Sequence, residues 1–257
     1  MRLGVVSDIH ANAPALDAAL AFLATQAVDG YLCAGDLVGY GPAPNECVHR
    51  VCALPGQVVA GNHDLIAIGE LGDDRCDRRA RDSLRWTSGV LEEEARGLLR
   101  ALARSARADG VAVYHGSPAD PREYVRTEAQ ALACLDELAR VAPGAEVLVL
   151  GHTHEPFAVG RRRGTLLKGG TGSVGLEPGE PMLLNPGSVG QSRSRDPRAR
   201  VMVLDLADRT ATFHAVAYDV AACRAALRAL GLPADSCHPW RPRWRAALHA
   251  LAGARDG

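Results

Sequence analysis

Five short apolar runs in the first part of the chain each end in side chains that can bind a metal ion or move a proton. The residues that follow these runs are Asp8-Ile9-His10, Asp36, Asn62-His63-Asp64, His115 and His152-Thr153-His154. In an open α/β sheet, the carboxyl ends of the strands face the crevice in which ligands bind. Five strands that end in this way would bring acidic, amide and imidazole groups to one edge of a sheet. The pattern therefore predicts an α/β fold with one polar site at that edge.

Amphipathic stretches separate the apolar runs. The predicted strands and helices alternate, with strands at 3–6, 31–34, 57–60, 111–114 and 146–150 and helices at 13–25, 44–53, 77–103 and 128–140. This alternation is typical of a layered α/β architecture. Asn12 is the predicted N-cap of the first helix, and Pro14 stands in its first turn.

The pattern changes after Gly151. Helical signals stop until about Asp219, and short apolar segments follow at 157–159, 165–168, 182–184, 201–206 and 211–217. These segments predict a second, mostly antiparallel sheet. The interval 169–181 holds five glycines and two prolines, so we expect it to be an exposed excursion between strands.

Length and composition exclude several classes of protein. A chain of 257 residues with 47% hydrophobic and 23% charged residues can form one globular domain. A net charge of −1 gives no field toward nucleic acid or an anionic membrane. Asp8 comes too early for the apolar region of a signal peptide, and the seven cysteines form no C-x-x-C pair. We therefore expect a cytoplasmic protein without disulfides, with neither a membrane nor a nucleic-acid partner.

The polar residues at the strand ends form a ligand set of four imidazoles, two carboxylates and one amide. Such a set, without thiolate, suits borderline divalent ions such as Mn, Fe or Zn. Seven ligands are too many for one tetrahedral zinc ion. They fit two ions about 3.5–4 Å apart that share one carboxylate, an arrangement that clamps both oxygens of an in-line phosphoryl displacement. Asp36 is the predicted shared ligand. The set is Asp8, His10, Asp36, Asn62, His115, His152 and His154.

Each motif also has a structural explanation when it is taken alone. An Asp-x-His sequence after a strand has no function in most proteins, and Gly-Asn-His-Asp can be a simple turn, because Asn and Asp tolerate left-handed backbone. The occurrence of all of them at successive strand ends favours a functional site.

The motifs resemble those of a known superfamily. Ser7-Asp8-Ile9-His10-Ala11-Asn12, Gly35-Asp36-Leu37-Val38-Gly39-Tyr40-Gly41-Pro42, Gly61-Asn62-His63-Asp64, His115-Gly116-Ser117 and Gly151-His152-Thr153-His154 are similar to the motifs of the calcineurin-like metallophosphoesterases. Asn185-Pro186-Gly187-Ser188-Val189-Gly190-Gln191 resembles the bacterial and archaeal branch of small phosphodiesterases. The resemblance implies a four-layer αββα sandwich, in which helices flank two mixed β-sheets. We expect this domain to cover residues 1–230, with an excursion near 161–181.

The resemblance also implies how the site works. One metal ion would be held by Asp8, His10, Asp36 and His154, and the other by Asp36, Asn62, His115 and His152. Manganese is favoured, with iron or zinc as alternatives. A hydroxide that bridges the ions would attack phosphorus. His63 would protonate the leaving oxygen, and Asp64 would orient the ring of His63.

Three further residues are predicted to contact the substrate. The resemblance puts the Asn185-to-Gln191 loop, with Ser188, beside the phosphate ester. Arg193 follows this loop and would bind phosphate oxygens in a bidentate manner, with Arg195 as the more distant alternative. Tyr40 would form part of the rim for a base or an aryl group.

These features predict a metal-dependent phosphodiesterase or phosphatase that acts on a small nucleotide-like ester. A dinucleoside polyphosphate hydrolase and a protein phosphatase are alternatives within the enzymes, and an interaction scaffold of the same fold is a non-enzymatic alternative. The near-neutral charge disfavours a nuclease. Residues 231–257 form a C-terminal extension that we expect to pack on the domain or to contact a second copy in a homo-oligomer.

Overall fold

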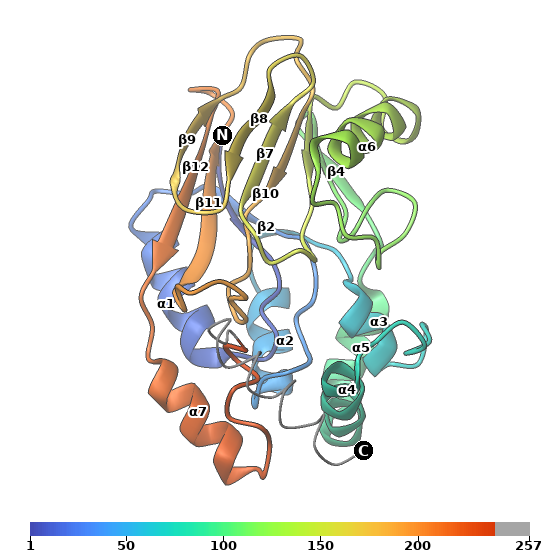
Figure 1. The fold of residues 1–257 in the computed structure, drawn as a ribbon, viewed down its shortest axis with the longest axis vertical. Helices are drawn as coiled ribbons and strands as arrows, with labels where there is room; N and C mark the ends of the chain where they lie inside the picture. The colour runs from blue at the N-terminus through green and yellow to red at the C-terminus, as the bar shows by residue number, and fades with distance from the viewer. Residues whose placement is uncertain (240–257) are drawn as a thin grey trace, which may run out of the picture.

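A computed structural model describes residues 1–239 of the chain. Its twelve strands form two six-stranded sheets, which lie face to face in the upper half of Figure 1. The first sheet has the order β3-β2-β1-β11-β12-β9, and the second has the order β4-β5-β6-β10-β7-β8. The strands are β1 (Arg2–Val6), β2 (Gly30–Cys33), β3 (Gly56–Val58), β4 (Ala106–Ala108), β5 (Val111–Val113), β6 (Val147–Val149), β7 (Phe157–Gly160), β8 (Gly164–Lys168), β9 (Gly172–Gly175), β10 (Met182–Asn185), β11 (Ala199–Asp205) and β12 (Thr210–Val216).

Helices cover the outer faces of both sheets and the end of the molecule that carries the site. The helix α6 lies on the second sheet, whereas the others gather around the lower half of the molecule in Figure 1. The helices are α1 (Ala13–Ala24), α2 (Pro44–Cys52), α3 (Asn62–Ala67), α4 (Arg78–Val90), α5 (Glu93–Ala101), α6 (Glu128–Val141) and α7 (Val220–Ala229). Asn12 caps α1 as predicted, because its side chain accepts a hydrogen bond from the amide of Ala15. Within the described residues, no helix is both long and apolar enough to cross a membrane.

Successive side chains of a strand point to opposite faces of the sheet, so they pack in different layers. In β11, Val201 and Val203 face the core under the outer helices, whereas Met202 and Leu204 face the core between the two sheets. A third core joins α6 to the second sheet. These three cores make four layers, and the predicted αββα sandwich is confirmed.

The expectation that the second half of the chain forms its own sheet is wrong. The strand β11 pairs antiparallel with β1 in the first sheet, and β10 pairs parallel with β6 in the second. Both β10 and β11 are buried along their whole length. A strand that is apolar on both faces is stable only inside a sheet that is covered on both sides, and strands from the first half of the chain provide that place.

The interval 161–181 is part of the two sheets and not a loose excursion. Its residues form β8, which pairs with β7, and β9, which pairs with β12, so that the chain crosses from one sheet to the other between these strands. Val174 and Leu176 are buried in the core between the sheets. The carboxylate of Glu180 accepts hydrogen bonds from the backbone amides of Arg162 and Arg163. These bonds link the start of the segment to its end.

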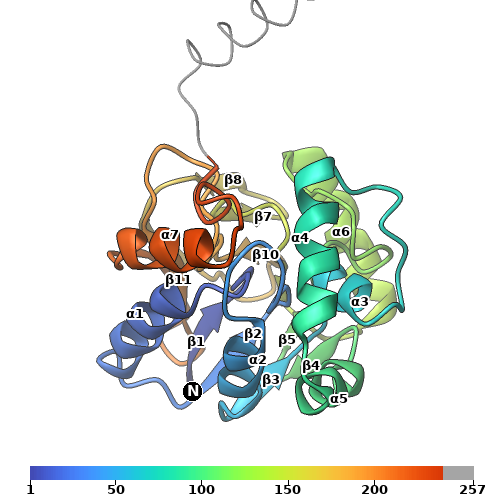
Figure 2. The same cartoon turned by 90° about the horizontal axis from the view of Figure 1, so that it is seen from below.

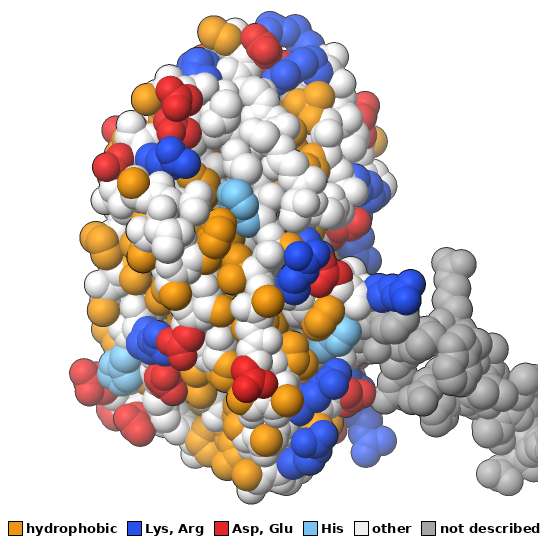
Figure 3. All heavy atoms as spheres, turned by 90° about the vertical axis from the view of Figure 1, so that its left-hand side faces the viewer, with side chains coloured by type: hydrophobic (Ala, Val, Ile, Leu, Met, Phe, Trp, Pro, Cys, Tyr) orange, Lys and Arg blue, Asp and Glu red, His pale blue; other side chains and the backbone are white. Residues whose placement is uncertain are grey.

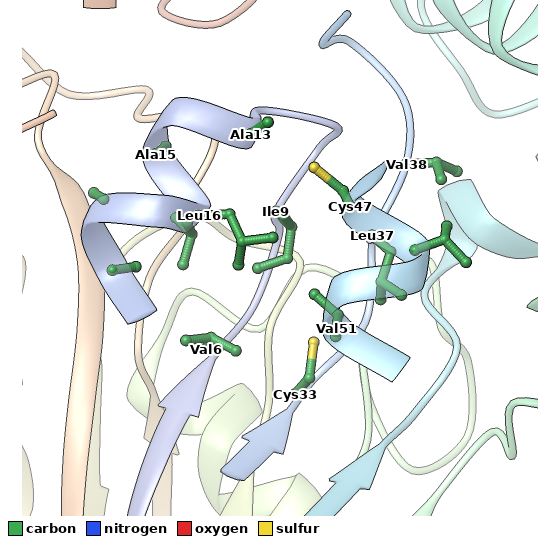
Figure 4. Packing of buried hydrophobic residues seen from close by; sticks show 14 of the residues in the cluster. Val6, Ile9, Ala13, Ala15, Leu16, Cys33, Leu37, Val38, Cys47 and Val51 are labelled. Carbon is green, nitrogen blue, oxygen red and sulfur yellow. The ribbon is translucent and has the colours of Figure 1, made fainter. Parts of the chain in front are cut away.

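The loops after β1 and β2 are anchored by apolar side chains that point away from the sheet edge. Ile9 and Leu37 lie in these loops, and Figure 4 shows them between α1 and α2 together with Leu16 and Val51. All four side chains are fully buried. The polar neighbours of Ile9 and Leu37 in the sequence are therefore held at fixed positions on the opposite side of each loop.

One side of the molecule shows an ordinary mixed surface. The face that includes α1, α7 and the edge of the first sheet carries interspersed acidic and basic side chains (Figure 3). This mixture agrees with the net charge of −1.

Candidate metal centre

The loops that carry the polar residues have an unusual backbone. Five of the predicted ligands have a positive φ, a conformation that costs a residue with a side chain about 1–3 kcal/mol and that clusters at functional sites. Their φ angles are 53° for Asp8, 48° for His10, 56° for Asp36, 65° for His152 and 62° for His154. The backbone of each loop is also tied to its neighbour, since the amides of Asp8 and His10 donate to the carbonyls of Gly35 and Asp36.

Asp8, His10 and His154 form the first group of the site. The Nδ1 atoms of His10 and His154 lie 3.0 Å and 2.6 Å from the carbonyl oxygens of Val38 and Gln191. A carbonyl only accepts, so each Nδ1 carries the proton and each Nε2 keeps a free lone pair. These two Nε2 atoms are 3.1 Å apart, and Asp8 Oδ1 is 3.3 Å from the Nε2 of His154. Three lone pairs thus converge without a proton between them, an arrangement that a bound cation would stabilise.

Asp36, Asn62, His115 and His152 form the second group. His115 donates from Nδ1 to the carbonyl of Ala34 at 2.6 Å. Its Nε2 lies 3.1 Å from Asn62 Oδ1 and 3.2 Å from Asp36 Oδ2. The ring centroid of His152 is 5.0 Å from that of His115, and its buried Nε2 has no hydrogen-bond partner within residues 1–239. With His115 in its neutral form, this group also presents lone pairs to one point.

Asp36 lies between the two groups. Its Oδ2 is 3.7 Å from His10 Nε2 and 3.2 Å from His115 Nε2, and its Oδ1 accepts a hydrogen bond of 2.8 Å from the amide of His63. Among the described residues, Asp8 Oδ1 makes no hydrogen bond although it is buried. The buried His and Asp clusters of the site could therefore hold metal ions, and their donor chemistry fits a pair of ions that shares Asp36.

The charges of the site favour cation binding. Burial lowers the pKa of His10 and of His154 well below the usual value, and burial together with His115 lowers the pKa of His152 to about 3. These imidazoles are therefore neutral, as a metal ligand must be. Burial opposes the ionisation of Asp36, but His115 outweighs it and the pKa of Asp36 falls well below its usual range. Burial likewise lowers the pKa of His115, yet Asp36 outweighs it and raises that pKa to about 9. A metal ion held by His115 would therefore displace the second ring proton of this residue.

Two glycines allow the loops to approach closely. A Cβ atom on Gly61 would lie 2.1 Å from Asp36 Oδ1 and 2.3 Å from the amide nitrogen of Asp36. A Cβ atom on Gly151 would lie 2.1 Å from Ser7 Oγ and 3.0 Å from Asp8 Oδ2. No side chain fits at either position without displacing a predicted ligand or its support.

His63 lies at the mouth of the site. Its ring centroid is 4.8 Å from those of His10 and Tyr40, and its side chain lines a cleft beside Asn62 and His152. This position, next to both groups of donors, is compatible with the predicted role of an acid.

The structure does not support the predicted role of Asp64. Its Oδ1 accepts from the amides of Leu37 and Val38 at 2.8 Å and 3.1 Å, and its Oδ2 accepts from the amide of Gly61 at 2.9 Å. Within residues 1–239, the Nδ1 of His63 has no hydrogen-bond partner. Asp64 therefore does not orient that ring but joins the loop after β2 to the start of α3, because both of its oxygens are used by backbone amides.

The predicted substrate contact of Ser188 is also corrected. Its hydroxyl donates to the carbonyl of Asp8 at 2.8 Å and accepts from the amide of Gln191 at 2.8 Å. The residue is fully buried, so it fastens one loop of the site to another and is not available to a ligand. Tyr40 and Arg193 do line the cleft, and Arg193 donates from Nη1 to the hydroxyl of Tyr124 at 3.3 Å.

The cleft contains residues that sequence reasoning missed. It has a volume of about 660 Å³ and extends from the metal centre along α4. Besides the predicted residues, its lining includes Arg75, Arg79, Arg122, Tyr124 and Gln191. Apart from Gln191, which ends the Asn185-to-Gln191 motif, none of these residues belongs to a motif. Single arginines carry no periodic signal, so the sequence offers no means of finding the three arginines.

The first residues of the C-terminal extension pack beside the cleft. Gln191 donates from Nε2 to the carbonyl of Ser236 at 2.7 Å, and Arg79 lies 3.1 Å from Asp235. Figure 2 views this end of the molecule, with α4 and the segment after α7 on either side of the strand-end loops. The rest of the predicted extension, residues 240–257, lies outside the described residues.

Comparison with known proteins identifies the family. Residues 1–209 match the model of the calcineurin-like phosphoesterase superfamily domain. The chain belongs to the calcineurin-like phosphoesterases. This family is metal-dependent and acts on small phosphate esters, and the clusters described above lie at the strand ends of its domain.

Individual relatives agree with this assignment. An uncharacterised protein of Methanocaldococcus jannaschii is 31% identical over 224 residues, which cover 85% of this chain and 88% of the relative. The crystal structure of a metallophosphoesterase from Sphaerobacter thermophilus has a TM-score of 0.77 and 32% identity, covering 92% of this chain and 97% of that one. A hypothetical protein from Pyrococcus horikoshii shares the fold, with a TM-score of 0.74 and 20% identity over 92% of this chain and 96% of its own.

Proposed function

We propose that this calcineurin-like protein is a phosphoesterase that uses two divalent metal ions to hydrolyse a small nucleotide-like phosphate ester. One observation carries the proposal: the Nε2 and oxygen atoms of six side chains meet 3.1–3.8 Å apart at the strand ends, and the buried Nε2 of His152 beside them has no hydrogen-bond partner within residues 1–239. The six are Asp8, His10, Asp36, Asn62, His115 and His154. The pair of Nε2 atoms of His10 and His154 is unfavourable without a cation, because both atoms are acceptors when each Nδ1 carries the ring proton.

Asp8, His10, Asp36 and His154 would hold one ion, and Asp36, Asn62, His115 and His152 would hold the other. The mixture of imidazole, carboxylate and amide donors favours Mn, with Fe or Zn as alternatives. When bound, the ions supply a water molecule acidic enough to act as nucleophile near neutral pH, together with positive charge against the phosphate oxygens.

The chain's own residues would do the rest of the chemistry. His63, beside both groups of donors, would hold the proton that the leaving oxygen receives. Arg193 would bind a phosphate oxygen that is not bound by the metals, because its guanidinium group lines the cleft and is oriented by Gln191 Oε1 at 3.3 Å and by Tyr124. This complete set of groups argues against an interaction scaffold.

The first experiment tests the metal-dependent reaction. Hydrolysis of bis(p-nitrophenyl) phosphate and p-nitrophenyl phosphate is measured after loading with Mn²⁺, for the wild type and for Asp36→Asn. We expect two bound ions per chain in the wild type by metal analysis, and loss of at least one ion and of turnover in the variant. Equal activity of the two proteins would rule out the enzyme, and one ion at saturation would rule out the dinuclear site.

The second experiment tests His63 as the acid. The variant His63→Ala is compared with His49→Ala, which changes a partly exposed histidine outside the motifs, on esters whose leaving groups differ in basicity. An acid is needed most for a poor leaving group. We therefore expect His63→Ala to slow the cleavage of an alkyl or phenyl ester much more than that of a p-nitrophenyl ester. An equal loss on all esters would indicate a structural role.

We also propose that the protein is cytoplasmic. The support for this is chemical: all seven cysteines lie in the described part of the chain, and all seven are free. Free buried thiols are typical of a reducing compartment.

A further inference from the structure

The cleft beside the metal centre is lined by more positive charge than one phosphate group needs. Its lining side chains include Arg75, Arg79, Arg122 and Arg193, with Asp77 as the acidic residue. Asp77 is already engaged, since its Oδ1 accepts from the amide of Ala80 at the start of α4. The cleft therefore presents four guanidinium groups and one carboxylate to a ligand, although the chain as a whole has a net charge of −1.

Arg75 and Arg122 each form an ion pair with a carboxylate outside the lining of the cleft. Arg75 Nη1 lies 2.6 Å from Asp120 Oδ2, and Arg122 Nη1 lies 3.2 Å from Asp74 Oδ1. Neither Asp74 nor Asp120 lines the cleft among the described residues. The carboxylates thus orient the guanidinium groups and leave other N–H groups of each arginine for a ligand, since one guanidinium has five donors.

Two of the arginines have donors that no protein group uses. Within residues 1–239, Arg122 Nε and Arg79 Nη1 are buried and make no hydrogen bond. The nearest carboxylate oxygen to Arg122 Nε, Asp120 Oδ1, is 3.6 Å away, which is too far for a good hydrogen bond. A buried charged donor without an acceptor is costly, and a rotation that turned either donor toward an anion in the cleft would supply the acceptor.

The two tyrosines of the cleft are not free to stack on a base. One face of the Tyr124 ring meets His152, with centroids 4.0 Å apart, and Arg126 lies over the ring at 4.2 Å. The ring of Tyr40 packs against His10 and His63, with centroids 4.8 Å apart in each case. Recognition in this cleft therefore rests on the arginines, which bind phosphate, and not on aromatic stacking.

We propose that the outer part of the cleft, formed by Arg75, Arg79 and Arg122, binds a second phosphate group of the substrate. The inference rests on the proposed function, in which the metal ions and Arg193 bind the phosphate that is cleaved. Three further guanidinium groups exceed what that phosphate can use, so the substrate class is an ester of a nucleotide-like molecule that carries at least two phosphates.

The test compares ligands that differ by one phosphate. Binding of thymidine 5′-monophosphate, thymidine 5′-diphosphate and thymidine 3′,5′-bisphosphate to the Mn-loaded protein is measured by calorimetry. The two doubly phosphorylated ligands cover adjoining and separated phosphates, and the base is the same in all three. We expect at least one of them to bind about ten- to hundredfold more tightly than the monophosphate, as charge-assisted hydrogen bonds predict.

Variants assign this preference to the arginines. Arg75→Ala and Arg122→Ala should each lower the preference about tenfold and leave the affinity for the monophosphate within twofold. Arg85→Ala is the matched control, because Arg85 is an exposed arginine of α4 that does not line the cleft among the described residues. The ion pairs of Arg75 and Arg122 are partly exposed, so both variants should fold, which melting curves will show.

The kinetic arm separates this inference from the proposed function. The p-nitrophenyl ester of thymidine 5′-phosphate is compared with the same ester that carries an additional 3′-phosphate. A wild type that binds and cleaves singly and doubly phosphorylated molecules equally well overturns the second-phosphate site and leaves the phosphoesterase standing. A protein that cleaves neither ester overturns the proposed function. In that case the second-phosphate site is judged by calorimetry alone: a preference for doubly phosphorylated ligands that the arginine variants lose supports it, and no such preference overturns it.

Discussion

The substitution Gly61→Ala tests whether the close approach of two loops sets the position of Asp36. The added Cβ atom would lie 2.1 Å from Asp36 Oδ1 and 2.3 Å from Asp36 N, whereas real Cβ atoms almost never come within 3.0 Å of another atom. The carboxylate could rotate away, but the backbone nitrogen cannot. The loop after β2 or the start of α3 must therefore move by about 0.7 Å or more, and Asp36 moves with it.

The size of the effect follows from that displacement. A misplacement of about 1 Å at a reacting centre can cost a factor of about 100 in rate, and disturbing the support of a metal ligand typically lowers metal affinity about 10- to 100-fold. Forcing an extra methyl group into a packed site also costs about 1–3 kcal/mol of stability. We expect Gly61→Ala to lose about two orders of magnitude in turnover and one order or more in affinity for at least one ion.

The assay combines Mn²⁺ titration by calorimetry, hydrolysis of bis(p-nitrophenyl) phosphate and chemical unfolding. The control is Gly97→Ala, because a Cβ atom at this position in the helix α5 has no atom within 4 Å. That variant should keep full activity and gain about 0.5–1 kcal/mol of stability, since alanine is favoured over glycine in a helix. If Gly61→Ala bound two ions with wild-type affinity and turned over at the wild-type rate, the proposed geometry of the shared ligand would be wrong.

Three further predictions concern residues around the centre. Ser188→Ala leaves the buried amide of Gln191 without its acceptor and removes one of the two hydrogen bonds to the carbonyl of Asp8, which keeps the one from the amide of Gly190. The variant should therefore lower the free energy of unfolding by about 1–3 kcal/mol in urea titrations while KM stays unchanged; a raised KM at wild-type stability would restore Ser188 as a substrate contact. Arg193→Ala should raise KM about tenfold, whereas Arg195→Ala, an exposed neighbour, should not change it; equal effects would remove Arg193 from the substrate site. Burial opposes the ionisation of Glu180, but the amides of Arg162 and Arg163 and the guanidinium of Arg163 outweigh it and lower its pKa. The pKa of Glu180 is lower in the folded chain than in the unfolded chain, where it is about 4.3. The ionised carboxylate therefore stabilises the fold at pH values above about 4.3, and this stabilisation is lost as the pH falls through the folded-state pKa. Stability curves of Glu180→Gln should therefore lie below those of the wild type at pH 7 and converge with them in acid; a constant gap across pH would exclude the ionic contribution.

Much of the site could be predicted from the sequence because its residues obey a simple rule. A buried strand in this fold is an apolar run, and the first polar side chains after it lie at the edge of the sheet. Asp8, Asp36 and His115 are each found in this way, without knowledge of which strand neighbours which. Their donor types then restrict the chemistry to divalent cations.

Partners in hydrogen bonds could not be predicted in the same manner. Asp64 stands next to His63 in the chain, and the resemblance to the family implied that it orients the ring of His63. In the structure, a helix begins at Asn62, and the carboxylate of Asp64 turns back to cap it and to bind amides of the loop after β2. A hydrogen bond depends on direction over about 3 Å, and adjacency in sequence does not determine direction.

The order of the strands in the two sheets could not be predicted from the sequence either. Strands of similar apolar character are interchangeable by composition, so the insertion of β10 beside β6 and of β11 beside β1 depends on which faces the remaining strands leave uncovered. The same holds for the interval 161–181, whose glycines suggested a loop although its ends complete both sheets.

The sequence by itself determined the layered α/β class, the seven candidate ligands and the family, because these depend on local periodicity and on residue type at strand ends. Only the tertiary structure decided what surrounds the metal centre. Arg75, Arg79 and Arg122 come from segments before α4, in α4 and after β5, and they meet in one cleft because the loops fold over the same sheet edge. Charge that converges from distant segments leaves no pattern along the chain, and in this protein that charge is what we propose selects the substrate.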